Sequence, residues 1–272
     1  MKKISRRSFL AAAAVSAAAL AMTACGGSAS SAASSVASSA ASSTAAALST
    51  VLAGKLTMAT NATFPPYEMT TDSGEIEGID VDTAKAIAEK LGLELQVDDM
   101  EFDAALLSVQ QGKADIVMAG VTVTDERKAV MDFSDSYATG IQSIIVPNDS
   151  DIASPDDLAG KKIGTQRGTT GYIYCSDDFG EDSVVAYDSG LTAVQALNNG
   201  QVDAVVIDNA PATQYVAANP GLKVLDTSYA EEDYAIGMAK GSALEDAINK
   251  ALEELKEDGT LQSIVDKYIN AN

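Results

Sequence analysis

The segment ALLSVQQGKADIVMAG, residues 105–120, joins a helical pattern to a glycine, an aspartate and a run of apolar strand residues. A second segment, LTAVQALNNGQVDAVVID at 191–208, repeats that order. Short apolar runs rich in branched residues that follow helical patterns are typical of the strands of an α/β sheet. Two such units, roughly ninety residues apart, predict two equivalent α/β lobes.

The flanking sequence continues the alternation of strands and helices. LTMAT (56–60), LELQV (93–97) and 116–121 are predicted strands, and VDTAKAIAEKLG (81–92) and 102–111 are predicted helices that stop at a glycine. KKIGTQRGTTGYIYC (161–175) indicates a strand, a turn and a helix. A helix, the strand GLKVLD (221–226), the segment DYAIGMA (233–239) and two helices, 242–258 and 261–269, follow. The expected fold class is therefore α/β.

The first 25 residues have the pattern of a secretory signal, with a basic start, an Ala/Val/Leu run and small residues before Cys25. Met22-Thr23-Ala24-Cys25 resembles the lipobox of bacterial lipoproteins, in which the cysteine is lipidated. Residues 5–10, SRRSFL, also resemble a twin-arginine export motif, and an ordinary basic leader is the alternative. Residues 26–50 are almost wholly Ser, Ala and Gly, which predicts a flexible tether between a lipid anchor and the folded part.

Composition excludes several classes of function. The leader holds four of the 18 basic residues and none of the 39 acidic ones, so the rest of the chain carries a net charge of −25. Such a charge disfavours nucleic acid and anionic membrane surfaces as partners. Histidine is absent, and Cys175 is the only cysteine beyond Cys25. These counts argue against His-based catalysis, Cys/His metal sites and an intramolecular disulfide, so we expect no metal site.

Polar residues follow four of the predicted strands. In open α/β sheets, ligands bind beyond the carboxyl ends of strands, where helix N-termini also point inward. The segments found there are 61–67 (NATFPPY), 120–127 (GVTVTDER), 166–171 (QRGTTG) and 208–211 (DNAP). These four segments are the predicted binding region.

Arg127 is one of only two arginines beyond the leader, the other being Arg167. Its planar guanidinium, with the Thr122 hydroxyl and the Gly120 backbone nearby, suits a carboxylate. Asp208 follows the strand AVVID and offers an anion to an ammonium group. A positive group in one lobe and a negative one in the other predict a receptor for a free α-amino acid.

Five motifs in order, ATNATFPPYE, EGIDVDTAKAIAEKLG, MEFDAALLSVQQGKADIVMAGVTVTDERKAVMDFSDSY, GKKIGTQRGTTG and VDAVVIDNAP, resemble the solute-binding proteins of polar amino-acid ABC importers, bacterial extracellular family 3. The resemblance covers about residues 54–270. It implies a type II periplasmic-binding-protein-like fold, in which two α/β lobes joined by two hinge strands close over a ligand without a cofactor. The implied organisation is a signal at 1–25, a tether at 26–50, one lobe from 51–138 plus 235–272, and a second lobe at 139–234.

The resemblance also assigns roles to individual positions. Arg127 and Thr122 correspond to the binders of the ligand carboxylate, with the Gly120 backbone beside them and Thr169 and Thr170 reaching from the other lobe. Asp208 corresponds to the acceptor for the ammonium group, and Phe64 and Phe102 to aromatic pocket walls. Asn61 falls where binders of cationic amino acids carry an acid, and Gln166 where glutamine-type binders can carry a lysine. A polar or neutral amino acid is therefore favoured as the ligand.

Each assignment has a structural alternative. Arg127 could be a surface helix residue paired with a neighbouring acid, Asp208 a helix cap, Phe64 and Phe102 core residues, and Thr169 and Thr170 caps only. At the level of function, two rivals stand beside a non-enzymatic binder. A secreted dehydratase-like enzyme would depend on Glu68 or Glu232, whereas a sensor or adhesin would normally continue into a membrane helix.

The expected partners follow from the same resemblance. They are a free amino acid, an ABC permease and, through the lipid on Cys25, the bacterial cell membrane. We expect an extracytoplasmic, lipid-anchored monomer that binds no nucleic acid.

Overall fold

The computed structural model describes residues 48–269. The predicted signal at 1–25, Cys25 and most of the predicted tether lie outside these residues. Leu48, at the end of the predicted tether, packs partly buried against the hydrophobic core, and the Val51 amide donates to the Asp115 carboxylate. These contacts tie Leu48 and Val51 to the first lobe, and the predicted boundary at residue 50 stays a prediction.

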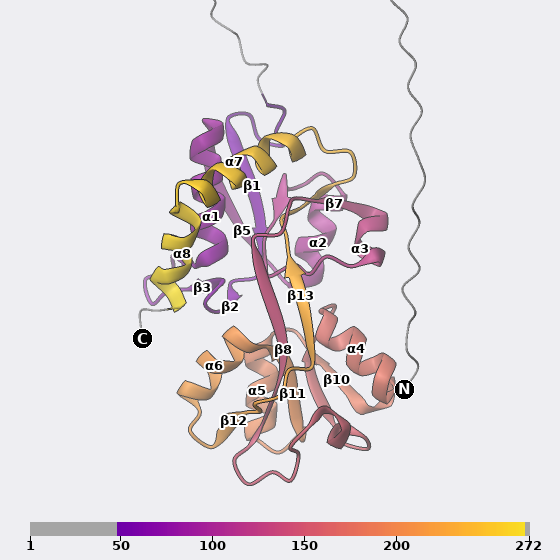
Figure 1. Ribbon diagram of the computed structural model, residues 1–272. Helices are drawn as coiled ribbons and strands as arrows, with labels where there is room; N and C mark the ends of the chain where they lie inside the picture. The colour runs from indigo at the N-terminus through magenta and orange to yellow at the C-terminus, as the bar shows by residue number, and fades with distance from the viewer. Residues whose placement is uncertain (1–47, 270–272) are drawn as a thin grey trace, which may run out of the picture. The chain divides into compact units, whose positions relative to one another are not determined.

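The first lobe is built on a five-stranded mixed sheet (Figure 1). Its order is β5 (Glu94–Asp99), β1 (Lys55–Thr60), β6 (Ile116–Val117), β14 (Gly237–Ala239) and β7 (Met131–Phe133). β1 pairs in parallel with β5 and β6, whereas β14 is antiparallel to β6 and β7. A small antiparallel sheet lies beside it, formed by β2 (Thr63–Phe64), β3 (Glu68–Thr70) and β4 (Ile76–Glu77).

Five helices belong to this lobe: α1 (Ile79–Leu91), α2 (Phe102–Gln110), α3 (Asp125–Val130), α7 (Glu245–Glu257) and α8 (Thr260–Ile269). α1 confirms the helix predicted at 81–92 but starts two residues earlier. It ends where Gly92 adopts φ +69°, a left-handed conformation that glycine takes without steric cost. The Gly92 amide then caps the last turn by donating to the Ala88 and Glu89 carbonyls.

The second lobe is built on a six-stranded sheet. Its order is β10 (Val184–Tyr187), β9 (Ile163–Gln166), β11 (Ala204–Asp208), β8 (Ala138–Pro147) and β12 (Leu222–Val224), with β13 (Ala230–Tyr234) also paired to β8. The remaining helices are α4 (Thr170–Phe179), α5 (Gly190–Asn198) and α6 (Asn209–Ala218), with short 3-10 turns at Pro155–Leu158 and Glu181–Ser183. β9, β10 and β11 are parallel, as the strand-helix alternation predicts.

The repeated segments form the same substructure in both lobes. α2 and α5 each lead through a glycine with φ +66°, Gly112 and Gly200, into β6 and β11. The aspartate before each strand accepts a backbone amide from the neighbouring segment: Asp115 from Thr57, and Asp203 from Lys162. The prediction of two equivalent α/β units is confirmed.

Two antiparallel strands, β8 and β13, run side by side between the lobes (Figure 1). Their pairing extends from Ala138 opposite Tyr234 to Gln142 opposite Ala230. The chain therefore passes between the sheets twice along one strand pair, as a two-stranded hinge requires. The predicted boundaries after residues 138 and 234 stay predictions.

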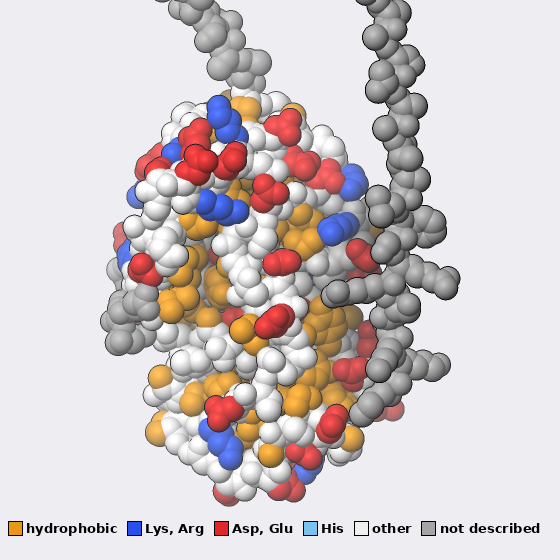
Figure 2. Space-filling view, viewed as in Figure 1, with side chains coloured by type: hydrophobic (Ala, Val, Ile, Leu, Met, Phe, Trp, Pro, Cys, Tyr) orange, Lys and Arg blue, Asp and Glu red, His pale blue; other side chains and the backbone are white. Residues whose placement is uncertain are grey.

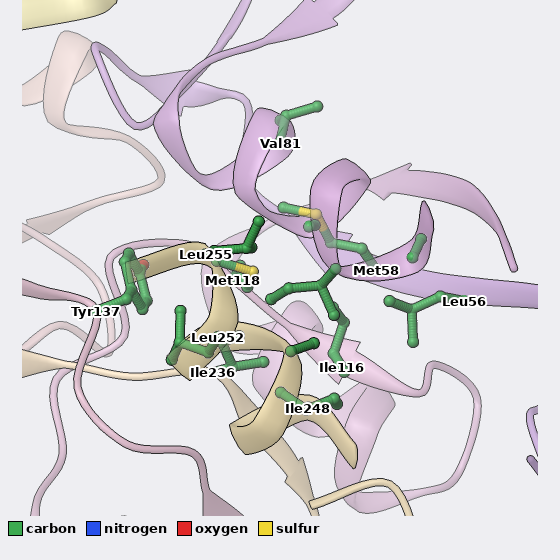
Figure 3. Close-up of a cluster of buried hydrophobic side chains, with 14 of the residues drawn as sticks. Leu56, Met58, Val81, Ile116, Met118, Tyr137, Ile236, Ile248, Leu252 and Leu255 are labelled. Carbon is green, nitrogen blue, oxygen red and sulfur yellow. The ribbon is translucent and has the colours of Figure 1, made fainter. Parts of the chain in front are cut away.

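The core of the first lobe lies between its sheet and helices α1, α7 and α8 (Figure 3). Met58, Ile116 and Ile236 come from strands or their continuations, and Ile248 and Leu252 from α7; all five are fully buried. The apolar spacing predicted for the C-terminal helices therefore serves packing, because Leu244, Ile248, Leu252 and Leu255 all join this cluster.

The strand predicted at 116–121 was too long. Only Ile116 and Val117 pair with β1, because Gly120 adopts φ +55° and turns the chain out of the sheet. Ala119 and Gly120 then line a cavity, and Thr122 forms an isolated bridge with Tyr234. The apolar character of this segment reflects burial rather than a continuous strand.

The surface follows the acidic composition. Acidic side chains outnumber basic ones on the face shown in Figure 2. Within residues 48–269, no helix combines the length and apolarity that crossing a membrane would require.

Candidate ligand-binding site

A cavity of about 20 Å³ lies where the two lobes meet. First-lobe side chains and second-lobe side chains both reach it. Its lining consists of Asn61, Phe64, Glu68, Phe102, Ala119, Gly120, Thr122, Arg127, Gln142, Gln166, Thr169, Thr170 and Tyr234. Nine of the ten predicted site residues are among them, and the tenth, Asp208, is not.

Arg127 is held in place by its own helix. It lies in α3, whose N-cap Thr124 accepts the Arg127 amide. The guanidinium donates from Nη1 to the Thr122 carbonyl at 2.8 Å and from Nη2 to the Gly168 carbonyl of the other lobe at 3.1 Å. Its carbon Cζ lies 5.4 Å from the centre of the Phe102 ring. These contacts fix the fork and leave further N–H groups free toward the cavity.

The Arg127 side chain carries a buried charge. The residue is only 9% exposed, and burial, the largest effect, lowers the pKa of its guanidinium although Glu232 and other groups oppose the shift. Across the described 48–269, no carboxylate lies within ion-pair distance of it. The surface-residue alternative is therefore wrong, and the cavity contains a cation without a counter-ion.

Thr122 and Thr170 face each other across the cavity. Their hydroxyl oxygens are 3.4 Å apart, and the Thr122 hydroxyl donates to Glu232 Oε2 at 3.1 Å. Thr169 is the N-cap of α4, because its hydroxyl oxygen accepts the Tyr172 amide, and it also lines the cavity. Capping and cavity lining therefore coincide at this helix N-terminus.

Asn61 and Gln166 form an amide pair between the lobes. Gln166 Nε2 donates to Asn61 Oδ1 at 2.8 Å, and Asn61 Nδ2 donates to the Met100 carbonyl at 2.9 Å. Both residues are buried. This end of the cavity is therefore polar and carries no charge on either amide.

The aromatic walls differ in their packing. Phe102 is buried with the α2 cluster and lines the cavity beside Arg127. Phe64 stacks on Tyr67, which in turn meets Tyr234 edge to face. Both predicted phenylalanines thus combine packing with a place in the cavity wall.

Asp208 lies behind the cavity wall. Its carboxylate caps α6 by accepting the Ala210 amide on Oδ1, and it accepts the Ile141 amide and the Tyr234 hydroxyl on Oδ2. Burial, only partly offset by these donors, raises its pKa to about 6. Tyr234 lines the cavity, so one side chain separates Asp208 from it. The capping alternative is confirmed for this residue, and its predicted contact with an ammonium group stays a prediction.

Glu68 and Asp80 form a buried acidic pair next to the cavity. Glu68 is 0% exposed, and burial, followed by the charge of Asp80, raises its pKa well above the usual value. Asp80 Oδ2 accepts the Gly120 amide at 3.0 Å and the Tyr137 hydroxyl at 2.8 Å. Burial raises the pKa of Asp80 to about 6, although both donors lower it. Asp80 therefore holds the Gly120 turn, and its charge is one of the groups that raise the pKa of the neighbouring Glu68.

We expect Asp80→Asn to flatten the dependence of stability on pH. The folded state holds the Asp80 proton more tightly than the unfolded state, so this stabilisation is complete below pH 3.8 and is lost as the pH rises through about 6. That shift corresponds to on the order of 2–3 kcal/mol. Urea unfolding at pH 4 and pH 7 measures the free energy of unfolding of the wild type and of Asp80→Asn. Between these two pH values it should fall less in Asp80→Asn than in the wild type. An equal fall in both proteins would show that Asp80 does not cause the pH dependence.

The two lobes touch each other directly around the cavity. Besides the contacts of Arg127 and Gln166, the Tyr215 hydroxyl of α6 donates to the Thr63 carbonyl of β2. These hydrogen bonds join segments more than forty residues apart on opposite sides of the hinge strands. The structure thus shows the lobes in a closed arrangement.

Comparison with known proteins agrees with this geometry. Residues 56–271 match the bacterial extracellular solute-binding proteins, family 3. The chain belongs to this family. A probable histidine-binding protein of Neisseria gonorrhoeae is 35% identical over 266 residues, covering 94% of each chain. The ABC transporter glutamine-binding protein GlnH of Bacillus subtilis is 36% identical over 202 residues, covering 72% of this chain and 74% of GlnH.

Solved structures of family-3 proteins share the fold. The arginine-, lysine-, histidine-binding protein ArtJ of Geobacillus stearothermophilus has a TM-score of 0.77 and 34% identity, covering 80% of this chain and 96% of that one. This family-3 protein therefore has the type II periplasmic-binding-protein fold, and the resemblance indicated by the five motifs is confirmed. Family 3 consists of solute-binding transport proteins rather than enzymes.

The sequence missed some of the lining. Gln142 and Tyr234 lie on the hinge strands β8 and β13, whereas the predicted binding region contains only segments that follow strand ends. Glu68 was named only in the enzyme alternative. A polar residue inside the apolar hinge segment 141–146 was the available signal for Gln142. In the part of the chain that the structure covers, no three Asp, Glu or Cys residues are grouped to hold a metal ion.

Proposed function

We propose that this protein binds a free α-amino acid outside the cytoplasm and delivers it to an ABC import permease. The family membership and the amino-acid-binding relatives support this function. The observation that carries it is Arg127, a fixed guanidinium that faces a cavity between two lobes and lacks a carboxylate partner. A carboxylate from the ligand supplies that partner.

Closure of the lobes is the proposed mechanism. The ligand carboxylate binds Arg127, and Gly120, Thr122, Thr169 and Thr170 line the cavity beside it. Contacts from both lobes to one ligand favour the closed form, because a ligand shifts a conformational equilibrium by its difference in affinity for the two states. Hinge motion along β8 and β13 then opens the cavity for exchange.

We propose a polar, uncharged side chain for the bound amino acid. The side-chain end of the cavity has the Asn61–Gln166 amide pair, and burial raises the pKa of Glu68, the one acid in the lining, well above its usual value. A cationic side chain there would be buried without a negative partner, which is costly. L-Glutamine has the matching chemistry, since its amide both donates and accepts hydrogen bonds.

Several relatives bind cationic amino acids, so arginine is the rival ligand. A thermal-shift screen of the full chain against the twenty amino acids and cystine, followed by calorimetry, separates the outcomes. Specific binding raises the melting temperature by mass action. We expect the largest shift with a polar neutral amino acid. A larger shift with L-arginine would overturn the ligand class, and no shift with any compound would overturn the function.

Asn61→Asp should move the preference toward cationic amino acids. A carboxylate at this position would face the ligand side chain, and a charged hydrogen bond is about twice as strong as a neutral one. We expect the ratio of L-arginine to L-glutamine affinity to rise by at least about tenfold, or about 1.4 kcal/mol. Asn199→Asp, which makes the same change at an exposed helix end, should leave the ratio unchanged. If the ratio of L-arginine to L-glutamine affinity is the same in Asn61→Asp as in the wild type, the ligand side chain does not contact residue 61.

The remaining assignments complete the proposal. A lipid on Cys25 anchors the protein to the cell membrane, the segment 26–50 acts as its tether, and the folded part works as a monomer. Lobe boundaries at 51–138 plus 235–272 and at 139–234 are supported by the strand pair that joins the sheets. Metabolic labelling with a fatty acid, compared between the wild type and Cys25→Ser, tests the anchor.

The enzymatic alternative retains one supporting observation. Glu68 lines the cavity, and burial raises the pKa of its carboxyl group well above the usual value, as is common for a general acid. Incubating the protein with its bound amino acid and analysing the products decides between the two functions. Recovery of unchanged amino acid supports transport, whereas accumulation of a dehydrated or deaminated product supports catalysis.

A further inference from the structure

Glu232 is a buried acid in the hinge that the proposed function leaves unexplained. It lies on β13, is 6% exposed, and has exposed neighbours on both sides, Glu231 and Asp233. It forms no ion pair within residues 48–269. Burying an acid without an ion partner is costly, so a structural role alone is a poor reason for an acid at this position.

The hydrogen bonds of Glu232 have a defined direction. Thr122 Oγ1 donates to Glu232 Oε2 at 3.1 Å, and Gln142 Nε2 donates to the same oxygen at 2.9 Å. Both donors line the cavity. Glu232 therefore lies directly behind the cavity wall and contacts it through one residue of the first lobe and one of the hinge.

The direction of the Thr122–Glu232 hydrogen bond determines whether the Thr122 hydroxyl can donate to a ligand or accept from it. A hydroxyl has one proton and two lone pairs. Because the proton points to Glu232, only lone pairs of Thr122 Oγ1 remain for other partners. Thr170, 3.4 Å away, can use one of them. The hydroxyl therefore accepts from a ligand and cannot donate to it.

We propose that Glu232 is a positioning residue that makes the Thr122 hydroxyl an acceptor for the ligand's α-ammonium group. This inference rests on the proposed function and deepens it, because it assigns recognition of the amine to the pair Glu232–Thr122. The ligand carboxylate then takes its donors from Arg127. Amino acids are therefore bound in preference to α-keto acids and deaminated acids, which have no α-ammonium group to donate to Thr122.

The neighbouring charges support this arrangement. Glu232 opposes the lowering of the Arg127 pKa, so the two groups interact electrostatically across the site. Tyr174 also lies near Glu232, and burial together with that acid raises its pKa to about 12. Asp208, the other acid proposed to meet the ammonium, already accepts three hydrogen bonds from the protein. Glu232 provides negative potential on the Thr122 side of the cavity.

The test compares each amino acid with the same molecule lacking its α-ammonium. The probes are L-glutamine with 5-amino-5-oxopentanoic acid, and L-arginine with 5-guanidinopentanoic acid, measured by calorimetry on the full chain. In Glu232→Gln, which loses the charge and gains an amide that can donate to the Thr122 hydroxyl as well as accept from it, we expect the ratio of amino-acid to deamino-acid affinity to fall at least about tenfold. Glu231→Gln makes the same change at an exposed site of the same strand and should leave the ratio unchanged.

Thr122→Val provides a second route if Glu232→Gln folds poorly. It removes the proposed acceptor, so the same fall in the ratio is expected, and combining it with Glu232→Gln should add little. If the variants lose affinity equally for an amino acid and its deamino analogue, or lose none, the role of Glu232 is overturned. Amino-acid binding by the wild type would be unaffected by that result. Failure of the wild type to bind either amino acid or any other in the screen would overturn the proposed function itself.

Discussion

Arg127→Ala should weaken amino-acid binding by two orders of magnitude or more while the protein remains folded. The ligand carboxylate would be buried in the closed cavity without its cation, which costs about 3–5 kcal/mol. The variant loses hydrogen bonds to two carbonyls, those of Thr122 and Gly168, but no ion pair. Calorimetry with the amino acid selected by the screen measures the loss, and circular dichroism with the melting temperature checks the fold.

Two further variants separate charge from geometry at this position. Arg127→Lys keeps a positive charge but loses the planar fork, so an intermediate loss is expected. Arg167→Ala removes the only other arginine beyond the leader, an exposed residue 3.7 Å from Asp188, and should leave the affinity unchanged. Wild-type affinity in Arg127→Ala would remove the basis of the proposed site.

Ile116→Ala should lower the free energy of unfolding by about 2–5 kcal/mol. Ile116 is fully buried on β6, where it pairs with Met58 of β1 on one side and Met238 of β14 on the other. Close packing by α7 on the same cluster limits collapse around the cavity that the truncation leaves. Urea denaturation monitored by circular dichroism measures the change.

The matched control is Ile173→Ala. Ile173 lies on α4 and is 40% exposed, so we expect a change within about 0.5 kcal/mol. A loss below about 1 kcal/mol for Ile116→Ala would show that the first-lobe core tolerates a cavity there. In that case the side chains around Ile116 in Figure 3 would be able to move into the cavity, although they are buried.

The element pattern could be predicted because it depends on local chemistry. Gly112 and Gly200 end helices in a left-handed conformation that other residues avoid, and an aspartate then precedes a branched strand in both lobes. Apolar spacing placed Ile248, Leu252 and Leu255 on the packed face of α7. Such signals act within a few residues, so a single sequence contains them.

Errors arose where a partner distant in the sequence decides the structure. The segment 116–121 is apolar throughout, yet the strand stops at Val117, since the Gly120 amide is held by Asp80, forty residues earlier. Asp208 accepts the Tyr234 hydroxyl and the Ile141 amide, contacts that its position after a strand does not reveal, and its role as an ammonium acceptor stays a prediction. None of these contacts is visible in local spacing.

The sequence by itself determined two α/β units, an acidic protein without histidine, and one arginine placed beyond a strand where a ligand can reach it. These properties follow from residue type and short-range order. Only the tertiary structure decided that Arg127 lacks a counter-ion, that Asn61 meets Gln166, and which way the Thr122 hydroxyl points. Burial and hydrogen-bond direction depend on groups brought together from both lobes, and the chain order alone does not specify their distances.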